Sequence, residues 1–383
     1  MELKKYKLGD IAKIEISGVD KKSVDGETPV RLCNFVDVYR NWAITQKLSE
    51  NFMIASAKET EIAKCSIHKG KVAITKDSET RDDIGIPAYI ADDFDNVLLG
   101  YHCALITPND DVLDGKYLNA FMHTRYIQKY FENNASGSGQ RYTLSNETIF
   151  QIPILLPSLE VQKAIGNLLS NIDRKIELNR QINDNLEKMA KQLYDYWFVQ
   201  FDFPNEDGRP YKSSGGAMVW NEKLKREIPK EWDNCTLEYY LIIKNGRDHK
   251  HLGNGIYPVY GSGGEIRKVD SFIYSGESIL MPRKGSLNNI MYVNDAFWSV
   301  DTMFYSEMKQ PHCAKYVFYS IKDIDFTRWD SGTGVPSMTS STLYSILLVK
   351  PDADSLAKFD EIITPLFLMI KKNEMQIVEL TKQ

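Results

Sequence analysis

The sequence predicts an α+β protein with two tandem copies of one unit, each a β-rich globular part followed by a long helix. Three observations lead to this prediction. A decapeptide rich in glycine and serine occurs twice, at 136–145 and 331–340. A short apolar strand that ends in proline follows each copy, at 152–157 and 346–351. A long segment with apolar residues at helical spacing follows each strand.

The first globular part is expected over 1–158 and the second over 228–350. Upstream of the glycine-rich repeats, residues 69–74 loosely match residues 275–280. In the second part, two strands are expected over Ser278–Met281 and Ile290–Val293, joined by the loop 283–289. Turn-forming residues fill 202–216 without periodicity, so 201–227 is interpreted as a connector loop.

The two helical segments, 159–200 and 351–383, carry the sharpest pattern. In each, the spacing of the inward positions alternates between four and three residues, which predicts a coiled-coil seam. The alternative is two unrelated amphipathic helices that cover separate cores. Asn179 and Asn373 match at a shift of 194 residues, and Pro365 either kinks the second helix or opens it with Thr364 as the cap. The seam positions are Ile165, Leu169, Ile172, Ile176, Asn179, Asn183, Leu186, Ala190, Leu193 and Trp197 in the first helix, and Phe359, Ile363, Leu366, Ile370, Asn373, Ile377 and Leu380 in the second.

Composition excludes several classes of protein. With 383 residues, of which 43% are hydrophobic, the chain predicts two or three folded domains and no membrane span. Five dispersed cysteines without a CxxC pair indicate reduced thiols, and the N-terminus has no apolar signal core, so a cytoplasmic location is expected. The net charge of −5 offers no general attraction to nucleic acid. A DNA-binding chain of this charge would have to gather its basic residues on one face or share the duplex with a partner.

The motifs of common enzymes are missing from the sequence. It contains no GxxxxGK[ST] loop, no GxGxxG after a strand, no HExxH, no GxSxG and no Asn-Pro-Pro-Tyr tetrapeptide. His249 and His251 lie in a polar segment and are interpreted as solvated rather than metal-binding. We therefore expect no catalytic residue, no metal site and no cofactor in this chain.

Polar and basic loops suited to DNA remain. Glycine allows close approach of backbone to phosphate, and Ser, Asn, Arg and Lys supply hydrogen-bond donors for phosphates and base edges. Ordinary β-turns are the alternative interpretation of each loop. The candidates in the first part are Lys69, Lys71, Lys76, Arg81, Arg141 and Tyr142; those in the second are Arg247, Lys250, Tyr260, Ser262, Arg283, Lys284, Ser286, Asn288 and Asn289.

Several of these segments resemble the specificity subunits of type I restriction–modification systems. The resemblance covers essentially the whole chain and is looser between Val19 and Asn96. It is carried by the connector, 197–205 and 210–216, and by three segments of the second part, 257–264, 298–305 and 331–336.

The resemblance implies two target-recognition domains in opposite orientation, held apart by two long antiparallel helices. Each domain would read one part of a bipartite, asymmetric sequence in double-stranded DNA. Modification subunits, two in number, would bind the helices and carry S-adenosylmethionine, and restriction subunits would join that complex in defence against phage. If the helices are antiparallel, Asn179 and Asn373 are expected to lie opposite each other. Members of this family usually continue further, so the second helix, which stops at Gln383, is expected to be short or trimmed.

Three alternatives stay open at this point. The chain could serve a related system in which the modification and cleavage activities are fused, because that difference lies in the partner. It could be an adapter that binds no DNA, with two β-rich modules on a coiled-coil spacer. It could also be an unrecognised enzyme whose clefts are lined by its 21 tyrosines and 6 tryptophans.

Overall fold

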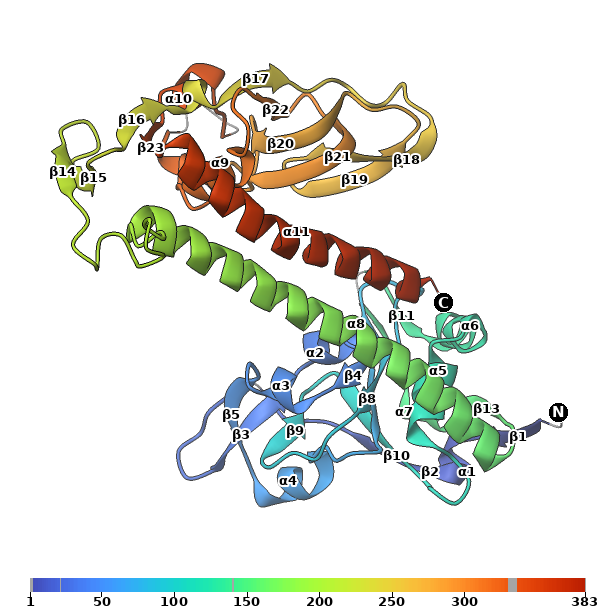
Figure 1. The fold of residues 1–383 in the computed structure, drawn as a ribbon. Coiled ribbons are helices and arrows are strands. Elements are labelled where there is room, and N and C mark those ends of the chain that lie inside the picture. The colour runs from blue at the N-terminus through green and yellow to red at the C-terminus, as the bar shows by residue number, and fades with distance from the viewer. Residues whose placement is uncertain (1–2, 21, 140, 330–335, 383) are drawn as a thin grey trace. The chain divides into compact units, whose positions relative to one another are not determined.

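The computed structural model describes residues 3–20, 22–139, 141–329 and 336–382. It divides into two compact units: Met1–Leu178 with Leu380–Gln383, called unit 1, and Asn179–Glu379, called unit 2. Each unit contains its own sheets, its own helices and its own buried core (Figure 1). The predicted α+β class is confirmed.

Unit 1 is built on a five-stranded sheet of order β2-β10-β6-β8-β4. Three smaller sheets join it: β1-β13, β11-β12-β7 and β5-β3-β9. The strands are β1 Lys4–Lys7, β2 Ala12–Ile16, β3 Thr28–Cys33, β4 Ala43–Ile44, β5 Met53–Ala57, β6 Val72–Thr75, β7 Asp77–Ser78, β8 Pro87–Ile90, β9 Val97–Leu99, β10 Cys103–Pro108, β11 Ser136–Ser138, β12 Arg141–Thr143 and β13 Pro153–Leu156. The helices are α1 Leu8–Ile11, α2 Phe35–Arg40, α3 Gln46–Ser49, α4 Glu59–Cys65, α5 Gly115–Met122, α6 Arg125–Asn134 and α7 Asn146–Phe150.

Unit 2 is built on a six-stranded sheet of order β17-β22-β20-β21-β18-β19, joined by the pairs β14-β15 and β16-β23. The strands are β14 Met218–Asn221, β15 Arg226–Pro229, β16 Asp233–Thr236, β17 Leu241–Asn245, β18 Asn254–Gly261, β19 Gly264–Val269, β20 Tyr274–Pro282, β21 Met291–Ser299, β22 Met303–Met308 and β23 Leu347–Lys350. The helical elements are α9 Ala314–Lys322, α10 Ser340–Tyr344 and the 3₁₀ turns Leu237–Tyr239 and Phe326–Trp329.

The two main sheets share one topology. In unit 1, β2/β10, β10/β6 and β6/β8 are antiparallel pairs and β8/β4 is a parallel pair. In unit 2, β17/β22, β22/β20 and β20/β21 are antiparallel and β21/β18 is parallel. In both units a capped short helix, α7 or α10, precedes the strand that leads to the long helix. The internal repeat found in the sequence is therefore a repeat of the fold.

One part of the sequence match is displaced by a residue. Ile74 of β6 pairs with Ala104 of β10, and Met281 of β20 pairs with Phe304 of β22. These pairings make Ile74 of unit 1 equivalent to Met281 of unit 2, which lies 207 residues later in the chain. The sequence match of 69–74 with 275–280 instead places equivalent residues 206 apart. The match relied on glycine and small residues at the strand entrance, which do not fix register, and a shift of one residue reverses the face of every side chain.

The expected connector loop, 201–227, contains more structure than its turn residues indicated. Strand β14 lies within it and pairs with β15. Phe201 and Phe203 are buried in the core of unit 2, where Phe203 stacks on Trp232 with ring centroids 4.6 Å apart. Aromatic side chains therefore anchor this segment to unit 2.

The long helices are α8, Leu159–Tyr194, which continues as a π-helical turn over Asp195–Val199, and α11, Ala353–Thr381 (Figure 1). Within unit 2 they run antiparallel, because contacts at higher residue numbers in α8 meet lower numbers in α11. The expected seam positions of this pair that are buried are Asn179, Asn183, Leu186, Ala190, Trp197, Phe359 and Ile363. In unit 1, Ile165 packs against the core. Helix α11 starts at Ala353 and continues through Pro365, so of the two alternatives at Pro365 the one in which the helix opens there is wrong.

The asparagines of the seam pair differently from the prediction. Asn373 Nδ2 donates to Asn183 Oδ1 at 2.8 Å, and Asn179 Nδ2 donates to Gln376 Oε1 at 3.2 Å. The predicted direct pairing of Asn179 with Asn373 is therefore wrong: each asparagine pairs with a residue about one helical turn away from its predicted partner. Sequence spacing fixes the phase of a seam but not the axial offset of two antiparallel helices. That offset agrees with the aromatic contact at the other end of the pair, where the ring centroids of Trp197 and Phe359 lie 5.7 Å apart.

Candidate nucleic-acid interface

Three segments far apart in the sequence meet at one place in unit 1. The Lys76 N–H donates to the His102 carbonyl at 2.8 Å, and the Lys76 carbonyl accepts from the Leu144 N–H at 2.9 Å. Strand β7 pairs with β12 in the register Thr143 with Asp77. We call the residues 76–78, 101–102 and 141–143 the unit 1 corner.

Unit 2 repeats this arrangement. The Arg283 N–H donates to the Thr302 carbonyl at 2.8 Å, and the Arg283 carbonyl accepts from the Met338 N–H at 2.9 Å. Lys284 forms a bridge with Ser337, and the Gly285 N–H donates to the Pro336 carbonyl at 3.1 Å. We call the residues 283–285, 301–302 and 336–337 the unit 2 corner. Lys76 and Arg283, both sequence candidates, are thus equivalent residues of the two units.

The unit 1 corner exposes cationic and aromatic side chains around one carboxylate. Arg81 lies over the ring of Tyr142, 5.1 Å from its centroid, and the Arg141 side chain is 66% exposed. Asp77 is 18% exposed and contacts both His102 Nδ1 and the Arg141 guanidinium. Burial alone would raise the pKa of Asp77, but hydrogen bonds from Thr143 and His102 and the charges of His102 and Arg141 outweigh it and lower that pKa. Asp77 is therefore an anion at neutral pH.

The unit 2 corner has a cation where unit 1 has its carboxylate, since Lys284 occupies the position of Asp77. Arg283 lies with its guanidinium 5.8 Å from the ring centroid of Phe304. Ser262 packs against this corner, because a Cβ added at Gly285 would lie 2.9 Å from Ser262 Oγ. Gly285 also has a φ of +88°, which glycine adopts without strain.

The loop that follows Arg283 is held by its own asparagines. Asn289 Nδ2 donates to the Ser262 carbonyl at 2.8 Å. Asn288 Nδ2 donates to Asp325 Oδ1 at 3.2 Å, and Asn288 Oδ1 accepts from the Phe326 N–H at 2.8 Å. Ser286 is exposed, and its carbonyl accepts from the Asn289 N–H. In this structure the amides of Asn288 and Asn289 fix the loop, and Arg283, Lys284 and Ser286 are its exposed donors.

The remaining candidates lie beside the corners or away from them. Arg247 borders the unit 2 corner, because its N–H donates to the Ser299 carbonyl at 2.8 Å, and Lys250 lies three residues farther along that exposed segment. Lys69 and Lys71 precede β6, whereas Lys76 follows it, so they lie at the opposite end of that strand. Lys71 Nζ donates to the Ser66 carbonyl at 3.0 Å, and burial lowers its pKa.

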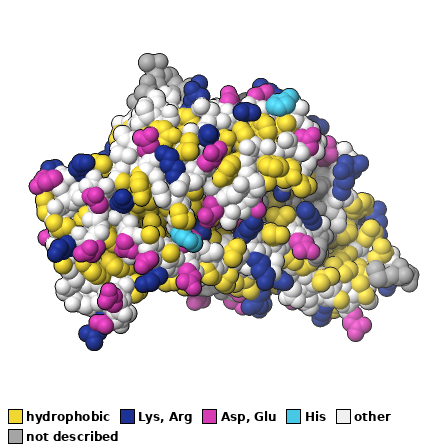
Figure 2. All heavy atoms as spheres, turned by 45° about the horizontal axis from the view of Figure 1, so that its top comes forward, with side chains coloured by type: hydrophobic (Ala, Val, Ile, Leu, Met, Phe, Trp, Pro, Cys, Tyr) yellow, Lys and Arg dark blue, Asp and Glu magenta, His cyan; other side chains and the backbone are white. Residues whose placement is uncertain are grey.

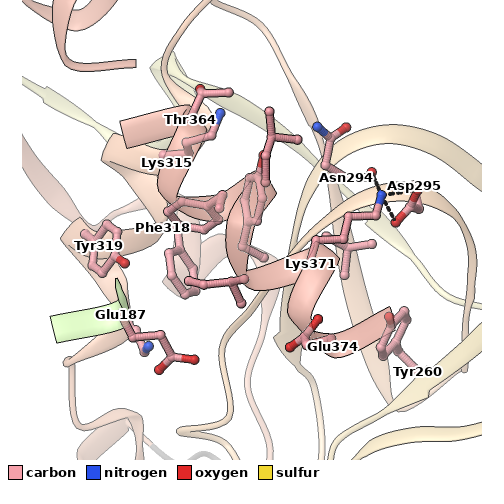
Figure 3. Close-up of a pocket in the computed structure, with 16 residues that line it drawn as sticks. Glu187, Tyr260, Asn294, Asp295, Lys315, Phe318, Tyr319, Thr364, Lys371 and Glu374 are labelled. Carbon is pink, nitrogen blue, oxygen red and sulfur yellow. Dashed lines mark hydrogen bonds and ion pairs between the residues drawn. The ribbon is translucent and has the colours of Figure 1, made fainter. Parts of the chain in front are cut away.

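Tyr260 lines a pocket of about 270 Å³ between α9, α11 and β21 (Figure 3). Burial raises the pKa of Tyr260 to about 12, and Lys371 pairs with Asp295 at 2.6 Å across the pocket rim. Five aromatic rings line it: Tyr260, Tyr292, Phe318, Tyr319 and Phe367. No cysteine, histidine or serine is among the described residues that line this pocket. The lining therefore provides neither a serine or cysteine nucleophile nor a histidine base.

Sequence reasoning missed Asp77, Tyr101 and His102. No periodicity marks them, and only the meeting of the three segments brings them together. Among the described residues, no group of three His, Cys, Asp or Glu side chains is arranged to hold a metal ion. In the same part of the chain, no helix combines the length and apolar character needed to cross a membrane. On the face drawn in Figure 2, Lys and Arg side chains are interspersed with Asp and Glu.

Comparisons with known proteins relate this arrangement to one family. The family model described as the type I restriction modification DNA specificity domain matches residues 1–188. The chain is 26% identical to the MjaIX specificity subunit of a type I restriction enzyme from Methanocaldococcus jannaschii, over 85% of this chain and 78% of that one. A shorter match, 31% identical, covers 37% of this chain and 30% of the HindI specificity subunit from Haemophilus influenzae.

The crystal structure of the S subunit of a type I restriction–modification system from M. genitalium has the same fold. It superimposes with a TM-score of 0.64 at 16% identity, covering 100% of this chain and 93% of that chain. Residues 1–188 thus belong to the type I DNA specificity domain family, and the chain as a whole is similar to type I specificity subunits. A specificity subunit is a non-catalytic component of its restriction–modification system, and DNA recognition is the role implied by this family.

Proposed function

We propose that this specificity subunit reads a bipartite, asymmetric sequence in double-stranded DNA, with each corner contacting one half-site. The single observation that carries the proposal is the recurrence of the corner at equivalent positions of both units, with Lys76 in one and Arg283 in the other. Exposed Arg and Lys side chains supply donors to phosphates and to guanine edges. The unlike residues at equivalent positions, Asp77 and Lys284, fit two different half-sites.

The proposal includes a role for the helices in setting the gap between half-sites and in docking modification subunits. Outside its seam, the helix pair of unit 2 exposes apolar side chains: Ile182 and Met189 in α8, and Ile362, Leu368, Met369, Met375 and Val378 in α11. In α11, Leu368, Met375 and Val378 share one face by their helical spacing, and such an exposed apolar stripe fits an amphipathic helix of a partner. The modification subunits, two in number, would supply S-adenosylmethionine, and restriction subunits would bind that complex. Partners would also provide phosphate contacts that a chain of net charge −5 lacks.

Methylome sequencing of the host with and without the gene for this chain tests the proposal. A bipartite methylation motif should be present only in cells that carry the chain. The adapter and enzyme alternatives predict identical methylomes in the two strains. A purified chain that binds one sequence selectively at nanomolar concentration and ~150 mM salt would contradict the expected dependence on a partner.

The spacing role has its own test. One heptad inserted into each helix keeps the seam in phase and adds about 10 Å at 1.5 Å per residue. At about 3.4 Å per base pair, the gap in the motif should grow by about three base pairs while the bases of each half-site stay the same. Three added base pairs also rotate one half-site relative to the other by about 100°, at about 10.5 base pairs per turn. The helix pair compensates for that rotation only in part, so activity should fall. An active variant that methylates the original spacing would leave the helices with a docking role alone.

The docking role is tested by Met375→Glu, which places a charge on the apolar stripe. This variant should lose co-purification with the modification subunit while Lys358→Glu, at an exposed position more than four turns away on the same helix, keeps it. Equal co-purification of the two variants would exclude this face as the docking surface.

A further inference from the structure

One arginine of the unit 1 corner is held in place although it is largely exposed. The nearest terminal nitrogen of Arg141 lies 3.7 Å from Asp77 Oδ2. Asp77 Oδ2 also contacts His102 Nδ1, which donates to it because the carboxylate can only accept. The Asp77 carboxylate therefore attracts Arg141 while His102 and Thr143 hold that carboxylate.

The backbone around this group is fixed as well. His102 has a φ of +71°, a conformation that residues with a Cβ rarely adopt. The His102 carbonyl accepts a hydrogen bond from the Lys76 N–H. The His102 ring packs edge-on against Tyr101, with the ring centroids 4.0 Å apart. Strand β12 places Arg141 beside β7 and thus beside Asp77. Such an outlier at a candidate site is typical of a residue whose position matters for function.

An arginine held by a carboxylate suits a base edge better than a phosphate. Arginine is a long side chain that loses rotamer entropy on binding, and an ordered guanidinium has given up part of that entropy beforehand. The charge of Asp77 offsets the charge of Arg141, so the pair has little attraction for a phosphodiester. Guanine presents two neutral acceptors, O6 and N7, in the major groove, and these match the guanidinium fork.

We propose that Arg141 reads a guanine in the half-site of unit 1, and that Asp77 and His102 are its positioning residues. This inference rests on the proposed function. Unit 2 presents a different chemistry at the equivalent corner, since Lys284 replaces Asp77 and Pro336 replaces Tyr142. The guanine preference therefore belongs to one half of the motif.

The test is methylome sequencing of the host that expresses the full chain as Arg141→Lys, Asp77→Asn or Arg125→Lys. Arg141→Lys keeps the charge and removes the fork, so preference for guanine at one position should fall about ten- to hundredfold. Asp77→Asn should relax the same position to a smaller extent. Arg125 is an exposed arginine at the start of α6 and is not one of the corner residues, so Arg125→Lys should leave the motif unchanged.

The possible outcomes separate the inference from the function it rests on. If Arg141→Lys keeps every base preference, or if Arg141→Ala lowers methylation at all sites alike, Arg141 is not a guanine reader and the inference is overturned. The wild-type motif then still supports the proposed function. If Asp77→Asn leaves that position unchanged while Arg141→Lys relaxes it, the positioning role is wrong. If the wild-type and deletion strains share one methylome, the proposed function fails as well.

Discussion

Units 1 and 2 share a scaffold and differ in what they attach to it. Their main sheets have the same strand order and directions, and the same backbone hydrogen bonds close both corners. Unit 1 adds the sheet β5-β3-β9 with helices α2 to α4, whereas unit 2 adds a sixth strand, β19, which pairs with β18. At the corner, unit 1 reinforces its loops with the β11-β12-β7 sheet, whereas in the described part of unit 2 the bridge of Lys284 with Ser337 takes the place of the β12-β7 pairing. A constant frame with unlike loops is the arrangement expected for reading an asymmetric sequence.

Unit 2 buries a charged side chain, Lys315, whereas the buried polar side chains in the described part of unit 1 are all uncharged. In unit 2, Lys315 of α9 is buried and donates to Glu277 of β20 at 2.6 Å and to Asp360 of α11 at 2.8 Å. His312 contacts the other oxygen of Asp360 at 2.9 Å. This network ties the long helix α11 to the sheet of unit 2.

The largest expected effect follows from removing that lysine. Lys315→Met leaves Glu277 and Asp360 without their shared cation, which should lower the free energy of unfolding by about 3–5 kcal/mol. Urea unfolding monitored by hydrogen exchange should show the decrease in unit 2 and not in unit 1. Lys358→Met, at an exposed position of the same helix, is the control. A decrease of under about 1 kcal/mol for Lys315→Met would show that the network does not stabilise this junction.

An intermediate effect is expected at the seam, where the structure corrects the sequence. A double-mutant cycle between Asn183→Ala and Asn373→Ala should give a coupling of about 1 kcal/mol, because the two amides share a hydrogen bond in a half-buried seam. The cycle between Asn179→Ala and Asn373→Ala should give a coupling near zero. The reverse result would restore the pairing expected from sequence spacing.

The prediction with the smallest effect on stability at neutral pH concerns His123 in unit 1. Burial lowers the pKa of His123 to about 4, and its ring stacks on Trp42 at 4.3 Å. As the pH falls from about 6.5 towards 4, an unfolded chain binds a proton that the folded chain does not, so stability should decrease over that range. His123→Phe keeps the stacked ring and removes the titration, so its melting temperature should depend less on pH there. Equal pH profiles of the two proteins would contradict a neutral buried His123.

Much of the fold could be predicted because local patterns encode it. The alternation of four and three identified the seam positions, and the glycine-rich repeats contain Ser145 and Thr339, which cap α7 and α10. Residues 330–335, which include half of the second repeat, and Gln140 of the first lie outside the described residues. The relative register of β6 and β20 could not be predicted from the sequence, because the loose match aligned the two strands one residue out of phase.

The site was harder to predict than the fold. Basic loop residues suggested Lys76 and Arg141 in unit 1 and Arg283 in unit 2. The grouping of the first two depends on backbone contacts of Lys76 with His102 and Leu144, which are distant in the sequence. The same reasoning could not see that Asn288 and Asn289 bond within the protein or that Lys71 donates to a backbone carbonyl. A sequence shows which side chains can form hydrogen bonds. Which partners they bond to depends on the neighbours that the fold brings close.

The central claim is that each corner reads its own half of one bipartite site. The most direct measurement is methylome sequencing of the host with two double variants, Lys76→Ala with Arg141→Ala and Arg283→Ala with Lys284→Ala. Removing a side chain that binds a base edge should cost about 1–3 kcal/mol of discrimination at that base. The account predicts that the first variant relaxes bases in one half-site and the second relaxes bases in the other half-site, with the gap unchanged in both. A motif that both variants leave intact, or one and the same half-site relaxed by both variants, would contradict it.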